Sequence, residues 1–173
     1  DSSVTGVQTC ALPISAPPPR RVLAALGPKM LALAAERADG AHPYNVTPEH
    51  TALARTALGP DKILAVEQKA VLTTDPTVAR ETARRTLAMY LGLPNYANNW
   101  RRLGFTDADL ADGGSDRFLD AMVVWGDEAA IRARVDEHLA AGADHVCLQV
   151  LDAEDAFAAP LDAWRRLAPA LTA

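Results

Sequence analysis

The chain has 173 residues, of which 49% are hydrophobic and 23% are charged, and its formal net charge is −5. These values are typical of one globular domain with its own core. The acidic balance argues against a general nucleic-acid or anionic-membrane surface, because both need a basic patch. The longest apolar run, residues 22–35, is interrupted by Gly27, Pro28 and Lys29 and is too short to cross a bilayer. We therefore expect a cytoplasmic protein with no nucleic-acid or membrane partner.

The first 19 residues differ in character from the rest of the chain. Residues 1–15 read DSSVTGVQTCALPIS and lack the basic residues and continuous apolar block of a secretory signal. This stretch closely resembles a translated sequencing adapter, and the Pro-rich residues 16–19 follow it. We therefore expect residues 1–19 to be a non-native or disordered leader and residues 20–173 to be the folded part.

After the leader, short apolar runs alternate with helical patterns. Thr47 and Asp75 are favourable N-cap residues, and a proline follows each of them. We expect strands at residues 21–26, 41–46, 63–72 and 145–151. We expect helices at residues 29–38, 48–58, 76–91, 116–125, 128–141 and 160–171, and a loop-rich segment at residues 92–114.

This order of elements predicts an α/β fold of parallel βα units with the helices outside. Four such units are about half of a (β/α)8 barrel, or TIM barrel, which normally needs ~250 residues. A doubly wound sheet is the second choice, because no glycine fingerprint of the dinucleotide type occurs. In a barrel the functional loops follow the C-terminal ends of the strands, so the candidate site residues lie there.

The loop after the first expected strand, residues 26–30, has the features of an anion site. Gly27 allows a ligand to approach the backbone closely, and Pro28 favours the first turn of a helix. The free amides of that turn and the helix dipole attract a phosphate, and Lys29 adds a positive charge. The alternative is a tight strand-to-helix turn with a solvated lysine.

Two further segments carry side chains that could line a pocket. Residues 41–45, at the second expected strand, hold three hydrogen-bonding side chains, although a histidine beside a proline is often an ordinary loop residue. Residues 93–104 could form a substrate-side lid, a dimer contact, or a capped helical turn whose aromatic side chains pack down. The candidates in the two segments are His42, Tyr44, Asn45, Tyr96 and Trp100.

The third expected strand contains charged residues. By alternation, Glu67 and Lys69 share one face of this strand and Gln68 lies on the other. Buried charges are costly unless they are paired, so we expect either a polar layer inside the barrel or a mutual ion pair. Cys147 lies in an apolar run and is expected to be a small buried residue. The histidines show no metal-ligand spacing, so no metal site is expected.

Several stretches resemble luciferase-like oxidoreductases. The segment RVLAALGPKMLALAAERADGAHPYNVTPEHT is similar to the region from the fifth strand through the sixth helix of that superfamily, and most similar to the branch that uses the deazaflavin coenzyme F420. The stretches LPNYANNWRRLGF, DLADGGSDRFLDAMVVWG and AGADHVCLQVL also resemble that branch. The resemblance extends from about Pro18 to the C-terminus and is based on the order and spacing of these stretches.

The resemblance implies hydride transfer between F420 and a small organic substrate, in a barrel that is usually a homodimer. It places the phosphate of the cofactor against the loop after the first strand of this chain. The implied cofactor-binding residues are Ala25, Leu26, Gly27, Pro28, Lys29, Met30, Gly40, Ala41 and His42. The implied substrate-binding residues are Tyr44, Asn45, Tyr96 and Trp100.

Three alternatives to this function stay open. One is an FMN-dependent monooxygenase on the same scaffold, since FMN also needs a phosphate cradle. Another is a fragment with no catalysis of its own, because the family's first four βα units are missing and its proton-transfer residues with them. We accordingly expect the chain alone to be inactive and either unstable or self-associating. The last is another phosphate-binding barrel such as a lyase, although Lys69 is a poor match for a Schiff-base lysine.

Overall fold

The computed structural model describes residues 19–154 and 158–172. Five strands form one parallel sheet in this part of the chain: β1 (Val22–Leu23), β2 (Gly40–Ala41), β3 (Ile63–Leu72), β4 (Val123–Gly126) and β5 (His145–Val150). The helices are α1 (Pro28–Arg37), α2 (Pro48–Leu58), α3 (Pro76–Leu91), α4 (Pro94–Arg102), α5 (Asp107–Leu110), α6 (Asp116–Met122), α7 (Glu128–Ala140) and α8 (Leu161–Leu171). The predicted leader lies outside the described residues, apart from Pro19.

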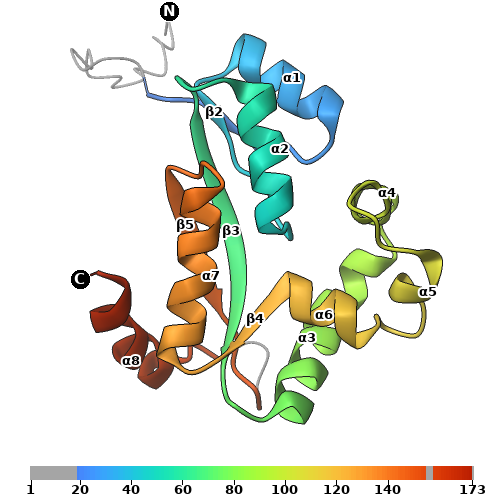
Figure 1. Cartoon of the computed structure of the whole chain (residues 1–173), viewed down its shortest axis with the longest axis vertical. Coiled ribbons are helices and arrows are strands. Elements are labelled where there is room, and N and C mark those ends of the chain that lie inside the picture. The colour runs from blue at the N-terminus through green and yellow to red at the C-terminus, as the bar shows by residue number, and fades with distance from the viewer. Residues whose placement is uncertain (1–18, 155–157, 173) are drawn as a thin grey trace, which may run out of the picture.

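Strand β3 is the centre of the sheet, and every other strand except β1 pairs with it. It pairs with β2 near its start, with β5 along most of its length, and with β4 at its end. Ala70 lies opposite both Val124 and Val150, so β4 and β5 occupy opposite sides of β3. Figure 1 shows β3 running the length of the molecule, with α1 and α2 near one end, α3 and α6 near the other, and α4 to the side between them. The predicted α/β class and partial barrel are confirmed.

The two faces of β3 have different neighbours. Leu64 and Val66 pack in one core with residues of α1 and α2, and Ala70 packs in another with Ile131 and Leu167 of α7 and α8. Period-two alternation then directs the odd-numbered residues of β3 to the opposite face, which is the interior of a barrel. Helices α1, α2, α7 and α8 therefore cover the outer face, as they do in βα units, whereas residues of α3, α4 and α6 pack with Val71 of the other face.

The predicted helix starts are largely correct, because the capping residues act locally. Thr47 accepts a hydrogen bond from the amide of His50, and Asp75 accepts from the first-turn amides of α3. Asp127 caps α7 in the same way. Such caps satisfy amides that have no partner inside the helix.

Several predicted elements need correction. The strands expected at residues 21–26 and 41–46 are reduced to β1 and β2, because the chain turns into loops directly after Leu23 and Ala41. Residues 92–114 are mostly helical rather than loop-rich, since Pro94 begins α4 and a capping box at Thr106 begins α5. The helix expected at residues 116–125 ends at Met122, where β4 takes over and pairs with β3.

The prediction that Cys147 is buried is wrong. Its side chain is exposed, as are those of His145 and Gln149. These residues alternate with Val146 and Leu148, which face the helices and are partly covered. No described helix or strand covers the other face of β5. The odd-numbered residues of this strand are therefore exposed to solvent, although its sequence is largely apolar.

Candidate functional site

The loop between β1 and α1 has unpaired amides at its helix N-terminus. Gly27 is the N-cap of α1 in an extended conformation, and Pro28 occupies the first helical position. The amides of Met30 and Leu31 both donate to the Gly27 carbonyl at 3.0 Å. Pro28 has no N–H, and within the described residues no acceptor is paired with the amides of Gly27 or Lys29. The arrangement therefore leaves two donors for an anion, close to the positive end of the helix dipole.

A cavity of about 420 Å³ lies against this loop, and α4 forms its other wall. Arg102 of α4 brings its guanidinium over the loop, since its Nη2 lies 3.3 Å from the position that a Cβ on Gly27 would take. The same Nη2 donates to Asn99 Oδ1 at 3.2 Å, which holds the side chain in place. The residues that line the cavity are Ala24, Leu26, Gly27, Pro28, Lys29, Met30, Asn95, Asn98 and Arg102.

The chemistry of this cavity suits a phosphate. Lys29 and Arg102 supply two positive charges from different helices, and no carboxylate lines the cavity. Arginine is well suited to phosphate, because its planar donors match two oxygens at once. The sequence analysis did not predict Arg102 as a phosphate-binding residue, although Asn95, Asn98 and Arg102 follow the spacing of one helix face. Recognising that spacing would have required α4 to be identified as a helix.

The other residues predicted to flank a cofactor lie in the first two βα units. Ala25 is buried in the core, and the Leu26 carbonyl accepts from His50 Nε2 at 2.9 Å. Gly40 and Ala41 are buried in β2, where a Cβ on Gly40 would collide with the backbone carbonyl of Ile63. The requirement for glycine at this position therefore comes from the close approach of β2 and β3.

His42 lies at the end of β2. Its amide donates to the Leu23 carbonyl at 2.8 Å, and its Nδ1 lies 2.8 Å from the Ala65 carbonyl. Because a carbonyl can only accept, Nδ1 carries the proton in this hydrogen bond. The ring is thereby oriented, and a neutral His42 has its Nε2 as an acceptor.

A buried ion pair lies on the interior face of β3. Lys69 Nζ is 3.0 Å from Glu67 Oε1 and donates to Asn45 Oδ1 at 2.6 Å. The second carboxylate oxygen of Glu67 accepts from the Asn45 amide at 3.0 Å. Burial lowers the pKa of Lys69, while the adjacent Glu67 carboxylate opposes that change. The prediction of a mutual ion pair is confirmed, and the two charges satisfy each other, while the buried Nδ2 of Asn45 has no hydrogen-bond partner among the described residues.

Aromatic side chains cover this ion pair. The Tyr44 ring lies 3.8 Å from Lys69 Nζ, and Tyr90 of α3 packs 5.8 Å from Tyr44 between ring centroids. The Tyr44 hydroxyl donates to Gln149 Oε1 at 2.6 Å, and burial raises the Tyr44 pKa. The aromatic contacts continue through Tyr96 to Trp100, so aromatic side chains of α3 and α4 connect these helices to the ion pair on β3.

The structure brings together all four residues predicted to bind substrate. Asn45 and Trp100 are joined directly, because the indole Nε1 donates to the Asn45 carbonyl at 3.1 Å. Both are buried, with 2% and 0% of their surface exposed, and present no surface to a ligand in this conformation. Tyr44 and Tyr96 are half-buried, and burial raises the pKa of Tyr96. Trp100 packs down from a helix, as the third alternative for this segment expected.

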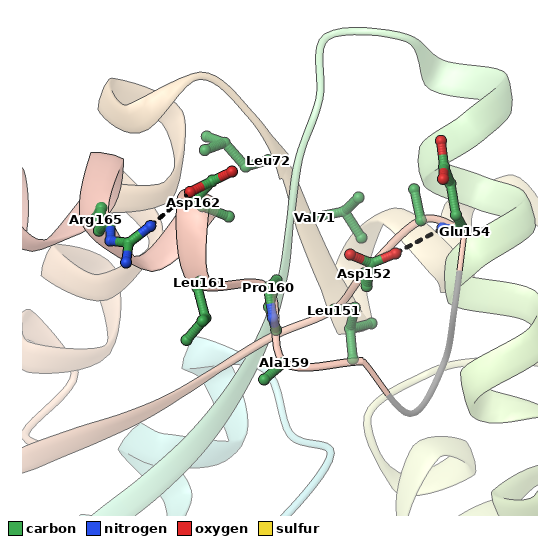
Figure 2. Close-up of a pocket in the computed structure, with 12 residues that line it drawn as sticks. Val71, Leu72, Leu151, Asp152, Glu154, Ala159, Pro160, Leu161, Asp162 and Arg165 are labelled. Carbon is green, nitrogen blue, oxygen red and sulfur yellow. Dashed lines mark hydrogen bonds and ion pairs between the residues drawn. The ribbon is translucent and has the colours of Figure 1, made fainter.

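Another cavity, of about 590 Å³, lies between the end of β5 and α8, and its lining is acidic rather than basic (Figure 2). Asp152, Glu154 and Asp162 line it together with Arg165, which pairs with Asp162 at 2.9 Å. Three carboxylates against one guanidinium do not suit a phosphate. In the described ranges, no three His, Cys, Asp or Glu side chains are placed to hold a metal ion, and no helix is long and apolar enough to span a membrane.

Comparison with known proteins gives a likeness in structure. No family model and no curated protein sequence matches the chain. The structure is similar to a coenzyme F420-dependent tetrahydromethanopterin reductase from Methanopyrus kandleri, with a TM-score of 0.59 and 19% identity over 76% of this chain and 44% of that one. It is also similar to an F420-dependent secondary alcohol dehydrogenase in complex with an F420–acetone adduct, with a TM-score of 0.59 and 14% identity over 87% of this chain and 48% of that one.

This chain spans less than half the length of either matched structure. At these identities the likeness concerns the fold. The chain therefore shares the fold of part of two F420-dependent oxidoreductases, in agreement with the family resemblance found in its sequence.

Proposed function

We propose that this chain is part of an F420-dependent oxidoreductase and binds the phosphate of the deazaflavin at the loop Gly27–Met30. The observation that carries the proposal is the cavity in which the free amides of Gly27 and Lys29 meet the side chains of Lys29 and Arg102. Both structures with a similar fold are F420-dependent enzymes by name, which supports this choice of cofactor.

The donor set of the cavity fits a phosphate group in three respects. It holds backbone donors at a helix N-terminus, two cations from separate helices and amide side chains at its rim. Gly27 leaves open the space that a side chain would take, next to the Arg102 guanidinium. The anion is therefore held by groups that need no rearrangement of the sheet.

The residues of this chain would bind and orient, while the deazaflavin, when bound, supplies the hydride chemistry. Gly27, Lys29 and Arg102 would fix the phosphate end of the cofactor. His42 and Tyr44 lie beyond the end of β2 on the interior side, where a substrate could meet their polar atoms. A proton-transfer residue is not part of the proposal. The homodimer implied by the family resemblance and the cytoplasmic location expected from the composition remain predictions.

The proposal is tested by titrating the chain with F420 and, separately, with FMN while following the fluorescence of each cofactor. Lys29→Ala and Arg102→Ala should each raise the dissociation constant for F420 at least about tenfold, which corresponds to ~1.4 kcal/mol. Arg101→Ala is the matched control, because Arg101 lies on the same helix as Arg102 but pairs with Asp107 of α5 and does not line the cavity.

The possible outcomes separate the alternatives. If the chain binds FMN but does not bind F420, the result would favour an FMN-dependent monooxygenase and contradict the proposed deazaflavin cofactor. If F420 binds but Arg101→Ala and Arg102→Ala lower its affinity equally, the result would contradict the proposed position of the site. If neither cofactor binds, the proposal fails for this chain.

A further inference from the structure

His50 lies behind the loop between β1 and α1. It occupies the first turn of α2, where its amide donates to Thr47 Oγ1, and only 2% of its surface is exposed. Its ring Nε2 lies 2.9 Å from the carbonyl oxygen of Leu26. Because a carbonyl can only accept, Nε2 carries the proton of this hydrogen bond. Burial lowers the pKa of His50, so the ring is neutral at neutral pH and its Nδ1 carries no proton.

The hydrogen bond from His50 fixes the direction of a donor in the phosphate cavity. The Leu26 carbonyl and the Gly27 N–H belong to one peptide unit, which is trans like the other described peptide bonds. In a planar trans peptide these two groups point in opposite directions. Since the carbonyl is held toward α2, the Gly27 N–H points away from α2. This direction agrees with the cavity of about 420 Å³, which Gly27 lines and no residue of α2 lines.

Asn99 holds a second group of the same cavity. It is buried, with 3% of its surface exposed, and its Oδ1 accepts from Arg102 Nη2 at 3.2 Å. His50 and Asn99 both line a smaller, mostly apolar cavity of about 230 Å³. Leu26, Pro28 and Arg102 line both cavities, so the two cavities are neighbours. The two buried side chains therefore support the phosphate cavity from the adjacent one.

Both side chains bury a polar atom without a partner. Within the described part of the chain, neither His50 Nδ1 nor Asn99 Nδ2 has a hydrogen-bond partner. An unpaired buried polar atom lowers stability, and an apolar side chain of similar size would avoid this loss. Stability alone therefore does not favour histidine and asparagine at these positions. Their paired atoms, in contrast, each hold a group that lines the phosphate cavity.

We infer that His50 and Asn99 are positioning residues of the phosphate site, with His50 directing the Gly27 amide and Asn99 directing the Arg102 guanidinium. Neither residue lines the phosphate cavity itself. The inference rests on the proposed function and deepens it, because it assigns the organisation of the site to two side chains behind it. A phosphate then meets donors that are already oriented, so little ordering is needed on binding.

The dissociation constant for inorganic phosphate, measured by NMR titration, tests this inference. His50→Leu keeps a side chain of comparable size but removes the donor to Leu26, and it should raise the dissociation constant at least about fivefold. His50→Gln keeps an N–H that can reach the carbonyl and should restore most of the affinity. Asn99→Leu should weaken binding to a similar extent as His50→Leu. Thr51→Val is the matched control, because Thr51 is a buried polar residue of α2 whose hydroxyl pairs with His138 instead.

A second readout needs no phosphate. The amide nitrogen shift of Gly27 responds to the hydrogen bond at the preceding carbonyl, so it should change in His50→Leu and return toward the wild-type value in His50→Gln. The midpoint of thermal unfolding of His50→Leu should stay close to that of the wild type, because the variant also removes the unpartnered Nδ1.

The outcomes separate this inference from the proposed function. If the wild type binds phosphate and His50→Leu binds it equally well, the inference fails while the proposed site stands. Equal weakening by Thr51→Val would overturn the inference too, since the loss would then come from a general disturbance of α2. The same holds if His50→Gln binds as weakly as His50→Leu. If the wild type does not bind phosphate, the proposed function fails and the inference fails with it.

Discussion

Two polar regions of this protein contain lysines, and they differ in how their groups are satisfied. Around Lys69, every charge has a partner inside the molecule, and aromatic rings exclude water from the pair. Around Lys29, amides and cations face an open cavity without a carboxylate. A satisfied and buried cluster stabilises the fold, whereas unsatisfied donors around an open cavity are available to a ligand. Residue type alone does not separate the two roles.

The largest effect is expected from breaking the buried ion pair. Glu67→Ala leaves the Lys69 ammonium buried without its carboxylate and removes the acceptor of the Asn45 amide. We expect a loss of about 3–5 kcal/mol in the free energy of unfolding, measured with urea. The double variant Glu67→Leu with Lys69→Met should recover part of this loss, because it removes both charges. Equal stability of Glu67→Ala and the wild type would contradict a structural role for the pair.

The next effect is a loss of stability in acid that arises from His138. This buried ring donates to Gln68 Oε1 and accepts from the Thr51 hydroxyl. Burial, helped by nearby Arg134, lowers its pKa from 6.5 to about 4, while Glu49 opposes the shift.

The sign of the pH effect follows from this lowered pKa. Between pH 6.5 and about 4, the unfolded chain binds a proton at His138 and the folded chain does not. Stability should therefore fall as the pH falls through that window, by about 1 kcal/mol per pH unit and roughly 3 kcal/mol in total. His138→Asn should flatten the curve of unfolding free energy against pH, leaving a smaller slope from His50, whose pKa burial also lowers. An unchanged slope in the variant would contradict the assignment.

A pair of glycine substitutions compares close packing with ligand access. Gly40→Ala should cost about 1–3 kcal/mol in unfolding free energy, because its Cβ would meet the Ile63 backbone. Gly27→Ala should change stability by less than about 0.5 kcal/mol, because its φ of −86° suits any residue and only the flexible Arg102 side chain is near. The added methyl group should nevertheless weaken phosphate binding. Thermal unfolding of both variants measures the contrast, and similar stability losses would contradict it.

The sequence was sufficient where local interactions decide the structure. The bounds of β3 and α3 were predicted correctly, because local residues determine them. Branched apolar residues favour the strand, and Asp75 with Pro76 begins the helix. The phosphate-binding role of Arg102 was not predicted, because its place beside Gly27 depends on where α4, far along the chain, lies relative to the β1–α1 loop. Cys147 was wrongly predicted to be buried. An apolar sequence indicates that a strand can be buried, whereas the neighbouring elements decide which of its two faces is buried.

We propose that the amides of Gly27 and Lys29 bind a phosphate in the loop after β1, and amide-resolved NMR during titration with inorganic phosphate tests this binding. We expect saturable shifts at these two amides that Arg102→Ala weakens and Arg101→Ala preserves. Shifts concentrated at another helix N-terminus, such as Ala130 of α7, with Gly27 and Lys29 unmoved, would contradict it.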